Sequence, residues 1–245
     1  MDMYRLPKLL LLATFALLGA CQQLPVGSWQ PAAYERLTWE HRQPGCKGRS
    51  CPFVNVDTLK FKDEPVLNRL IERRLLEMTR IDPDAPLPAS FPAYERDYLS
   101  AAQPEENSYL QAQVREQQGN LVIVELSSYL STGGAHGMPG RGFINFDRQR
   151  DRELRLKDLL LPGREDAFWA LAEQAHQSWL KAKGHSRNAE FVEFWQFQKT
   201  RNVALLKDRL LLKYDVYSIA PYASGHPELS ISKQQLKGIL KAEYL

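Results

Sequence analysis

The sequence predicts an α+β fold: an antiparallel sheet with packed helices, arranged as two closely associated subdomains. Two observations support this prediction. Apolar residues recur at helical spacing in some segments, and in others they form short strand-like runs on either side of a turn. These helices and hairpins follow one another without the regular strand–helix–parallel-strand order that builds a doubly wound fold.

The first predicted helix begins at Asp63-Glu64-Pro65. Asp63 can cap the free amides of the first turn, and Pro65 suits the first helical position. We expect the helix to end before the proline-rich stretch between Pro83 and Pro92. The apolar face of this helix consists of Leu67, Leu70, Ile71, Leu75 and Met78.

The next segments predict strands. Residues 109–117 and 120–130 flank a Gly-Asn turn, which is typical of a β-hairpin, and residues 143–147 read as a third strand. Residues 203–216 predict a second hairpin, with its turn at 207–209.

Two further helices are expected in the second half of the chain. Residues 164–183 predict an amphipathic helix that ends at Gly184. A last helix is expected to begin at Ser232, because Gln235 three residues later completes a capping box. The inward face of the longer helix consists of Phe168, Leu171, Ala172, Ala175 and Trp179.

The N-terminus is typical of an export signal. Arg5 and Lys8 precede an apolar run over residues 9–16, and the small residues Gly19 and Ala20 follow. A positive start, an apolar core of about 7–15 residues and small residues before a cleavage site describe a secretory signal peptide. The run is too short to cross a membrane as a helix, which takes roughly 20 residues.

The segment Leu18-Gly19-Ala20-Cys21 resembles the bacterial lipobox, in which the cysteine receives lipid and becomes the mature N-terminus. The alternative is an ordinary signal peptide followed by an unmodified cysteine. Lipid on Cys21 would anchor the chain to a membrane, since each buried methylene contributes about 0.8 kcal/mol. Gln22 is not the aspartate of an inner-membrane retention signal, which favours the outer membrane and a protein that faces the periplasm.

Removing the leader changes the charge little. Loss of Arg5, Lys8 and Asp2 lowers the formal net charge from +3 to +2, since two positive charges and one negative charge leave. So small an excess gives no reason to expect nucleic acid as a partner.

The two remaining cysteines, Cys46 and Cys51, predict a structural disulfide in an oxidising compartment. So short a loop contributes only about 2 kcal/mol in the chain-entropy model. The alternatives are a redox pair or half of a metal site. The spacing is not the two-residue spacing of thioredoxin-like sites, and the sequence holds no second cysteine pair for zinc.

Two segments carry a resemblance to a known family. The first runs from Tyr129 through Gly133-Gly134-Ala135-His136-Gly137 to residues 143–147 and 154–159, and the second runs from Tyr217 to Gly225 with the sequence YSIAPYASG. In this order and separation they resemble the extracellular domain of the RsiV-type anti-sigma factors. That domain also occurs in bacterial lipoproteins and beside the catalytic domain of a peptidoglycan deacetylase.

The resemblance covers about residues 107–241 and implies a mixed α/β fold with an antiparallel sheet. In the anti-sigma factors the domain binds lysozyme. This chain has neither a transmembrane helix nor a sigma-binding segment, so we do not expect it to signal by that route. The implied organisation is a signal peptide at 1–20, a lipidated tether at 21–33, an N-terminal partner module at 34–105 and the RsiV-like domain at 106–245.

The two segments also supply the candidate ligand-binding residues. Their glycines permit positive φ and the close approach of another backbone, and their tyrosines offer rigid contact area. The alternatives are a tight turn in which His136 is hydrogen-bonded locally, and a packing role for Tyr217. The candidate set is Tyr129, Gly133, Gly134, His136, Gly137, Tyr222, Gly225 and His226.

The sequence contains no nucleophile elbow and no His-Glu-x-x-His motif, so it identifies no catalytic residue, metal ligand or cofactor. A carboxylate pair for glycan hydrolysis is defined by its separation in space. Asp147, Asp215 and Glu228 are the candidates, against the alternative of solvated or turn carboxylates. The aromatic segment 191–197 either packs against the preceding helix or offers a platform for sugars.

These observations predict a lipid-anchored cell-envelope binding protein that engages lysozyme-like proteins or peptidoglycan. A cell-wall glycan hydrolase, a deacetylase-associated enzyme and an envelope scaffold protein are the alternatives.

Overall fold

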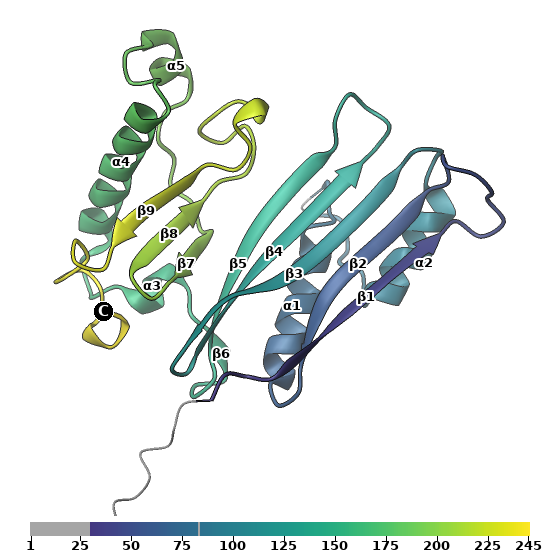
Figure 1. Ribbon diagram of the computed structural model, residues 1–245, viewed down its shortest axis with the longest axis horizontal. Helices are drawn as coiled ribbons and strands as arrows, with labels where there is room; N and C mark the ends of the chain where they lie inside the picture. The colour runs from purple at the N-terminus through teal and green to yellow at the C-terminus, as the bar shows by residue number, and fades with distance from the viewer. Residues whose placement is uncertain (1–29, 83) are drawn as a thin grey trace, which may run out of the picture.

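A computed structural model of the chain describes residues 30–82 and 84–245. The predicted signal peptide, the predicted lipidation at Cys21 and most of the predicted tether lie outside these residues. A six-stranded sheet, a three-stranded sheet and a small number of helices make up the described part (Figure 1), which confirms the α+β prediction. None of the helices in these two ranges is both long enough and apolar enough to cross a membrane.

The large sheet has the order β1-β2-β3-β4-β5-β6. Its neighbours pair antiparallel except β2 and β3, which run parallel and are joined by two helices. The sheet is continuous across residue 106, so the predicted partner module and the segment that follows it share one sheet. Its strands are β1 (Tyr34–Arg42), β2 (Phe53–Phe61), β3 (Asn107–Gln118), β4 (Leu121–Ser131), β5 (Met138–Asp147) and β6 (Arg152–Glu153).

Helices α1 (Pro65–Glu77) and α2 (Phe91–Ala101) cover one face of the large sheet (Figure 1). The predicted apolar face of α1 is confirmed in large part, since Leu67, Ile71 and Leu75 are fully buried. Together with apolar residues from β2–β5 and α2, these side chains form the first of two cores. Every second residue of the central strands points into this core, as the period of a strand requires.

Two details at the helix ends differ from expectation. The predicted cap by Asp63 is wrong, because Glu64 occupies the N-cap position of α1 and its side chain makes no capping hydrogen bond. Helix α2 was not predicted, although Ser90 accepts a hydrogen bond from the amide of Ala93 and Pro92 lies in the first turn. Both residues are normal helix-start signals, but the prolines around them had suggested only a break.

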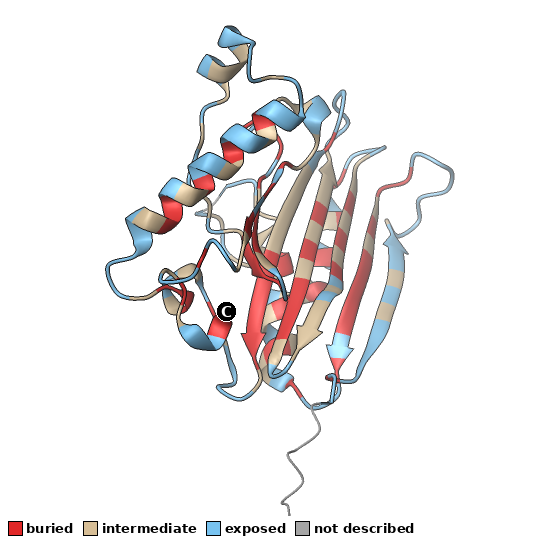
Figure 2. Ribbon diagram, turned by 60° about the vertical axis from the view of Figure 1, so that its left-hand side comes forward, coloured by how far each residue is buried: buried red, intermediate tan, exposed pale blue. Residues whose placement is uncertain are grey.

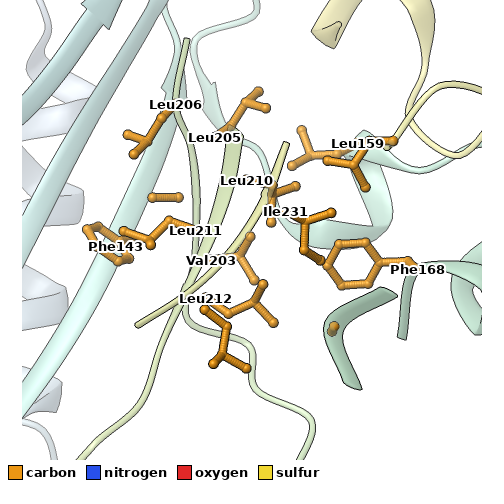
Figure 3. Close-up of a cluster of buried hydrophobic side chains, with 14 of the residues drawn as sticks. Phe143, Leu159, Phe168, Val203, Leu205, Leu206, Leu210, Leu211, Leu212 and Ile231 are labelled. Carbon is orange, nitrogen blue, oxygen red and sulfur yellow. The ribbon is translucent and has the colours of Figure 1, made fainter. Parts of the chain in front are cut away.

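The small sheet has the order β7-β8-β9 and packs against the other face of the large sheet. Helix α4 (Glu165–Ala182) covers its far side, so Phe143 of β5 and Phe168 of α4 lie on opposite sides of it (Figure 3). This second core has Leu205, Leu210 and Leu212 at its centre. The remaining elements are β7 (Val203–Leu205), β8 (Arg209–Lys213), β9 (Glu228–Ser232), α3 (Leu156–Leu159), α5 (Ala189–Phe194) and the 3₁₀ turns η1 (Tyr222–Ser224) and η2 (Ala242–Tyr244).

The last predicted helix is wrong. Ser232 ends strand β9, which pairs antiparallel with β8, and the chain then continues in turns. The capping-box hydrogen bonds do form, because Ser232 donates its amide to Gln235 Oε1 at 3.1 Å. Gly238 then has φ +76°, outside the helical region, and the turns bury Leu236 and Leu240 instead of extending a helix.

The predicted disulfide is confirmed. Cys46 and Cys51 are bonded, with their Cα atoms 5.8 Å apart, and they close the loop between β1 and β2. Cys51 is buried, so the bond ties the exposed loop to the start of β2.

A buried side chain of the large sheet forms hydrogen bonds with the first strand of the small sheet. The Asn145 amide on β5 donates to the carbonyl oxygen of Val203 at 2.7 Å, and its oxygen accepts the amide of Leu205 at 2.7 Å. Both partners lie on β7, and Asn145 is only 4% exposed. The side chain therefore takes the place of a strand neighbour for β7, whose backbone groups would otherwise be buried without partners.

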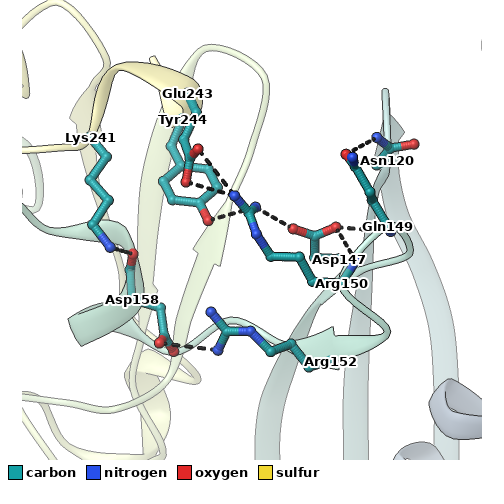
Figure 4. Close-up of polar contacts among 9 residues, drawn as sticks. All are labelled: Asn120, Asp147, Gln149, Arg150, Arg152, Asp158, Lys241, Glu243 and Tyr244. Carbon is teal, nitrogen blue, oxygen red and sulfur yellow. Dashed lines mark hydrogen bonds and ion pairs between the residues drawn. The ribbon is translucent and has the colours of Figure 1, made fainter.

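The C-terminal segment is fixed to the large sheet by charged groups (Figure 4). Asp147 at the end of β5 is buried and accepts hydrogen bonds from the amides of Gln149 and Arg150. The guanidinium of Arg150 also reaches Asp147 at 2.6 Å and Glu243 at 3.1 Å. Asp147 is thus a turn carboxylate.

We predict that Asn145→Ala lowers the free energy of unfolding by about 3 kcal/mol. The substitution leaves two buried backbone groups of β7 unpaired, each at a cost of about 1–3 kcal/mol. Urea unfolding of the two proteins measures the difference. Asn107→Ala is the control, since the Asn107 amide makes a 3.3 Å bond to the carbonyl of Glu105 at the surface. Similar small losses in both variants would contradict the role given to Asn145.

Candidate functional site

Two loops that lie far apart in the sequence meet beside the ends of β4 and β5. The Tyr222 hydroxyl, in the β8–β9 loop, donates to the carbonyl oxygen of Gly137 in the β4–β5 loop at 3.1 Å. The amide of Gly137 donates in turn to the hydroxyl of Tyr129 on β4 at 3.1 Å. The structure therefore brings together four of the predicted ligand residues: Tyr129, His136, Gly137 and Tyr222.

The rings of His136, Tyr217 and Tyr222 form a cluster on this junction, which we call the aromatic loop cluster. The His136 and Tyr222 rings stack, with centroids 3.9 Å apart and planes 19° from parallel. Tyr217 lies 5.6 Å from the Tyr222 ring, and its hydroxyl is 3.3 Å from His136 Nε2. Tyr217 keeps 49% of its surface exposed, so the cluster presents an aromatic ring to solvent.

The backbone at the cluster depends on special conformations. Tyr217 has φ +64°, a region that costs a residue other than glycine about 1–3 kcal/mol. Gly137 has no room for a side chain, because an added Cβ would lie 2.4 Å from the Tyr129 ring and 2.8 Å from the carbonyl oxygen of Leu130. The close approach at Gly137 therefore comes from within the protein, and the binding of another backbone or a sugar by these glycines stays a prediction.

The other predicted ligand residues lie around the cluster in different settings. Gly133 and Gly134 are exposed at the tip of the β4–β5 loop, and Gly225 follows η1 with φ +66°. The His226 ring is largely buried, and its Nδ1 lies 3.1 Å from the carbonyl oxygen of Tyr214. Burial, followed by the charge of Arg141, holds the pKa of His226 below its usual value of 6.5.

The two carboxylates near the cluster are held by partners. Asp215 accepts the amide of Arg141 at 2.9 Å. Glu228 lies 2.9 Å from Nζ of Lys213, which also bonds Glu125 at 2.5 Å. In the described residues, no three His, Cys, Asp or Glu side chains lie close enough together to hold a metal ion.

A polar face that the sequence did not single out extends away from Tyr129. Tyr129 pairs in register with Tyr109 of β3, and on the same face Gln111 donates to Asp57 at 2.7 Å. Arg36 of β1 donates to the same carboxylate at 2.6 Å and holds its pKa below the usual value. Figure 2 shows the exposed strand β1 and the alternation of buried and partly exposed residues on its neighbours.

We call this surface the open sheet face and define it by Arg36, Asp57, Tyr109, Gln111 and Tyr129. The sequence contained one indication of the open sheet face, because polar residues occupy alternate positions of β3. Their partners on β1 and β2 became visible only with the strand pairing.

The chain is similar to known proteins in both sequence and fold. A family model described as a protein of unknown function, DUF3298, matches residues 157–234, which include the β8–β9 loop. A crystal structure of a DUF3298 family protein from Pseudomonas aeruginosa PAO1 is 56% identical with a TM-score of 0.84, over 88% of this chain and 97% of that one. A member of this family from Bacteroides fragilis NCTC 9343 is 19% identical with a TM-score of 0.66, over 86% and 94% of the two chains, and shares the fold.

A curated relative extends the comparison. The peptidoglycan-N-acetylmuramic acid deacetylase PdaC of Bacillus subtilis (strain 168) is 27% identical over 129 residues, which are 51% of this chain. The chain spans only 27% of the length of that relative.

We predict that Gly137→Ala disrupts the junction and lowers the free energy of unfolding by about 1–3 kcal/mol, because the methyl group overlaps the Tyr129 ring. Gly134→Ala is the matched control in the same loop, since nothing lies within 4 Å of an added Cβ there. Thermal unfolding of both variants provides the measurement. Equal stability of the two would show that the loops are not packed as described.

We also predict that the free energy of unfolding falls as the pH is lowered from 7 towards 5. The pKa of His226 is below 6.5 in the folded protein, so under pH 6.5 the unfolded chain takes up a proton more readily. His226→Gln should reduce the slope of stability against pH in this window, as measured by urea unfolding at several pH values. An unchanged slope would contradict the assignment.

Proposed function

This chain belongs to the DUF3298 family, and we propose that it is a cell-envelope protein that binds peptidoglycan through the aromatic loop cluster. The observation that carries the proposal is the convergence of two distant loops on the aromatic loop cluster, in which His136 stacks on Tyr222 and Tyr217 lies beside them with its ring exposed. The relative PdaC is named as a peptidoglycan-N-acetylmuramic acid deacetylase. That name supports peptidoglycan as the class of ligand for this chain.

The chemistry of the cluster suits a glycan. Aromatic faces stack on the apolar faces of sugars, and a tyrosine provides both a large apolar ring and a polar hydroxyl. The exposed Tyr217 ring offers such a face, and Gly133 and Gly134 leave backbone groups of the adjacent loop accessible. The open sheet face continues from Tyr129 with amide, hydroxyl and charged groups that can hydrogen-bond further sugar units.

The fixed carboxylates favour binding over hydrolysis. Asp147, Asp215 and Glu228 each already hold partners within the fold. A glycosidase needs two carboxyl groups that flank the scissile bond. Here Asp147 accepts amides of its own turn, Asp215 accepts the amide of Arg141, and Glu228 pairs with Lys213.

The place of the protein in the cell is part of this proposal. The leader and Cys21 support export and a lipid anchor at the outer membrane, facing the periplasm, with residues 34–105 as a partner module for the domain that follows. The resemblance to RsiV-type anti-sigma factors makes a lysozyme-like protein the second ligand to test. Near the aromatic loop cluster Glu228 is paired with Lys213, whereas Asp215 accepts a backbone amide and keeps its negative charge. One such carboxylate attracts the positively charged lysozyme only weakly, so peptidoglycan is favoured.

We predict that the full-length processed chain co-sediments with purified peptidoglycan sacculi and that Tyr217→Ala weakens this binding by about tenfold, equivalent to about 1.4 kcal/mol. Tyr34→Ala is the matched control. Tyr34 is 47% exposed, against 49% for Tyr217, and it lies at the opposite end of the large sheet.

Binding of the unmodified protein and of the same two variants to immobilised lysozyme is measured at modest salt. Binding to lysozyme alone would replace peptidoglycan as the ligand of the aromatic loop cluster. Binding to neither, or an equal loss in both variants, would overturn the proposal.

A further inference from the structure

A pocket lies between α4 and α5, in a part of the fold away from the aromatic loop cluster. Helix α5 follows the C-terminal end of α4 at the tip of the molecule (Figure 1). The pocket has a volume of about 570 Å³, which is within the range of about 300–1,000 Å³ typical of small-ligand sites. His176, Leu180, Val192 and Phe197 contribute to its lining.

His176 is the unusual group in this pocket. It is 1% exposed, and neither Nδ1 nor Nε2 has a hydrogen-bond partner among the described residues. Buried polar groups are nearly always hydrogen-bonded, so an imidazole with both nitrogens free requires an explanation. Burial lowers the pKa of His176, against a smaller opposing effect of Glu173, and so favours the neutral ring.

The neutral ring presents one donor and one acceptor. The two nitrogens point in different directions, so a peptide backbone can pair with one of them, through either an N–H or a carbonyl oxygen. Stacking holds the ring in place, because Trp179 lies 6.1 Å away with its plane 12° from parallel and Phe197 lies 5.9 Å away. His176 is therefore a fixed hydrogen-bonding group in the pocket wall. Its two nitrogens are enclosed, so a ligand reaches one of them when the lining side chains shift.

The rim adds charges of both signs. Glu173 of α4, Glu193 of α5 and Arg187 before α5 all line the pocket. The segment that carries Arg187 is held by its own contacts: the His185 and Phe191 rings stack at 3.8 Å, and Asn188 caps α5. The pocket is thus lined by an imidazole without hydrogen-bond partners among the described residues, two carboxylates and one guanidinium.

From these features we propose that the pocket between α4 and α5 binds a short peptide that carries both an amine and a carboxylate. His176 pairs with a peptide amide, Glu173 and Glu193 hold the amine, and Arg187 holds the carboxylate. The two sources of such a ligand are the stem peptide of the cell wall and a segment of another protein. This inference does not depend on the aromatic loop cluster.

Calorimetry and ring-nitrogen NMR of the full-length processed chain test the proposal with two probes. One is the stem tripeptide L-Ala–γ-D-Glu–meso-diaminopimelate, and the other is L-Ala–L-Glu–L-Lys. We expect at least one probe to bind and to shift the ring nitrogens of His176. Preference for the first identifies a cell-wall peptide, and preference for the second a protein segment. If neither probe binds at millimolar concentration, the proposal is overturned.

Variants then locate the binding. His176→Phe keeps an aromatic ring but removes both nitrogens, and should weaken binding by about tenfold or more. Glu193→Gln, at an exposed position that folding tolerates, should weaken it several-fold. The control Glu35→Gln removes an exposed carboxylate on β1. Unchanged affinity in Glu193→Gln and His176→Phe would overturn the proposal. Tyr217→Ala should retain peptide binding, which separates this test from that of the proposed function.

Discussion

The hydrogen bonds of Asn145 to β7 constrain the rest of the structure. They fix the small sheet against the large one at a buried point, where an unpaired backbone group would cost about 1–3 kcal/mol. The placement of β7 also determines the placement of β8 and β9, because all three strands share one sheet. The β8–β9 loop thereby reaches the β4–β5 loop, so the candidate site depends on a polar contact that lies outside it.

The two faces of the large sheet are covered to different extents, which explains why the face opposite α1 and α2 carries polar side chains. Helices α1 and α2 bury the first face completely enough to form a continuous apolar core. The small sheet covers the second face only around β4 and β5, where Ile123 and Phe143 are buried. Over β1–β3 the same face is open, and its side chains are accordingly polar or amphipathic, with the buried Asp57 paired to Arg36.

The sequence predictions succeeded where they depended on residues that lie close together in the chain. The β3–β4 hairpin, the length of α4 and the Cys46–Cys51 bond rest on residues that are neighbours in the chain, and all three were predicted. The turn after Ser232 shows the limit of this reasoning, because its capping hydrogen bonds form without a helix. Burial of Leu236 and Leu240 against the second core decided the conformation there.

By itself, the sequence determined the α+β class, most of the elements, the disulfide and the two loop segments, because periodicity, turn residues and short spacings are local properties of a chain. Only the tertiary structure decided that β1 and β2 extend the sheet, that His136 stacks on Tyr222, and that His226 faces the backbone of its own loop. It also placed His176 beside a pocket, with no hydrogen-bond partner in the part of the chain that the structure describes. These features depend on strand order and sheet packing, which bring together residues that no local spacing relates.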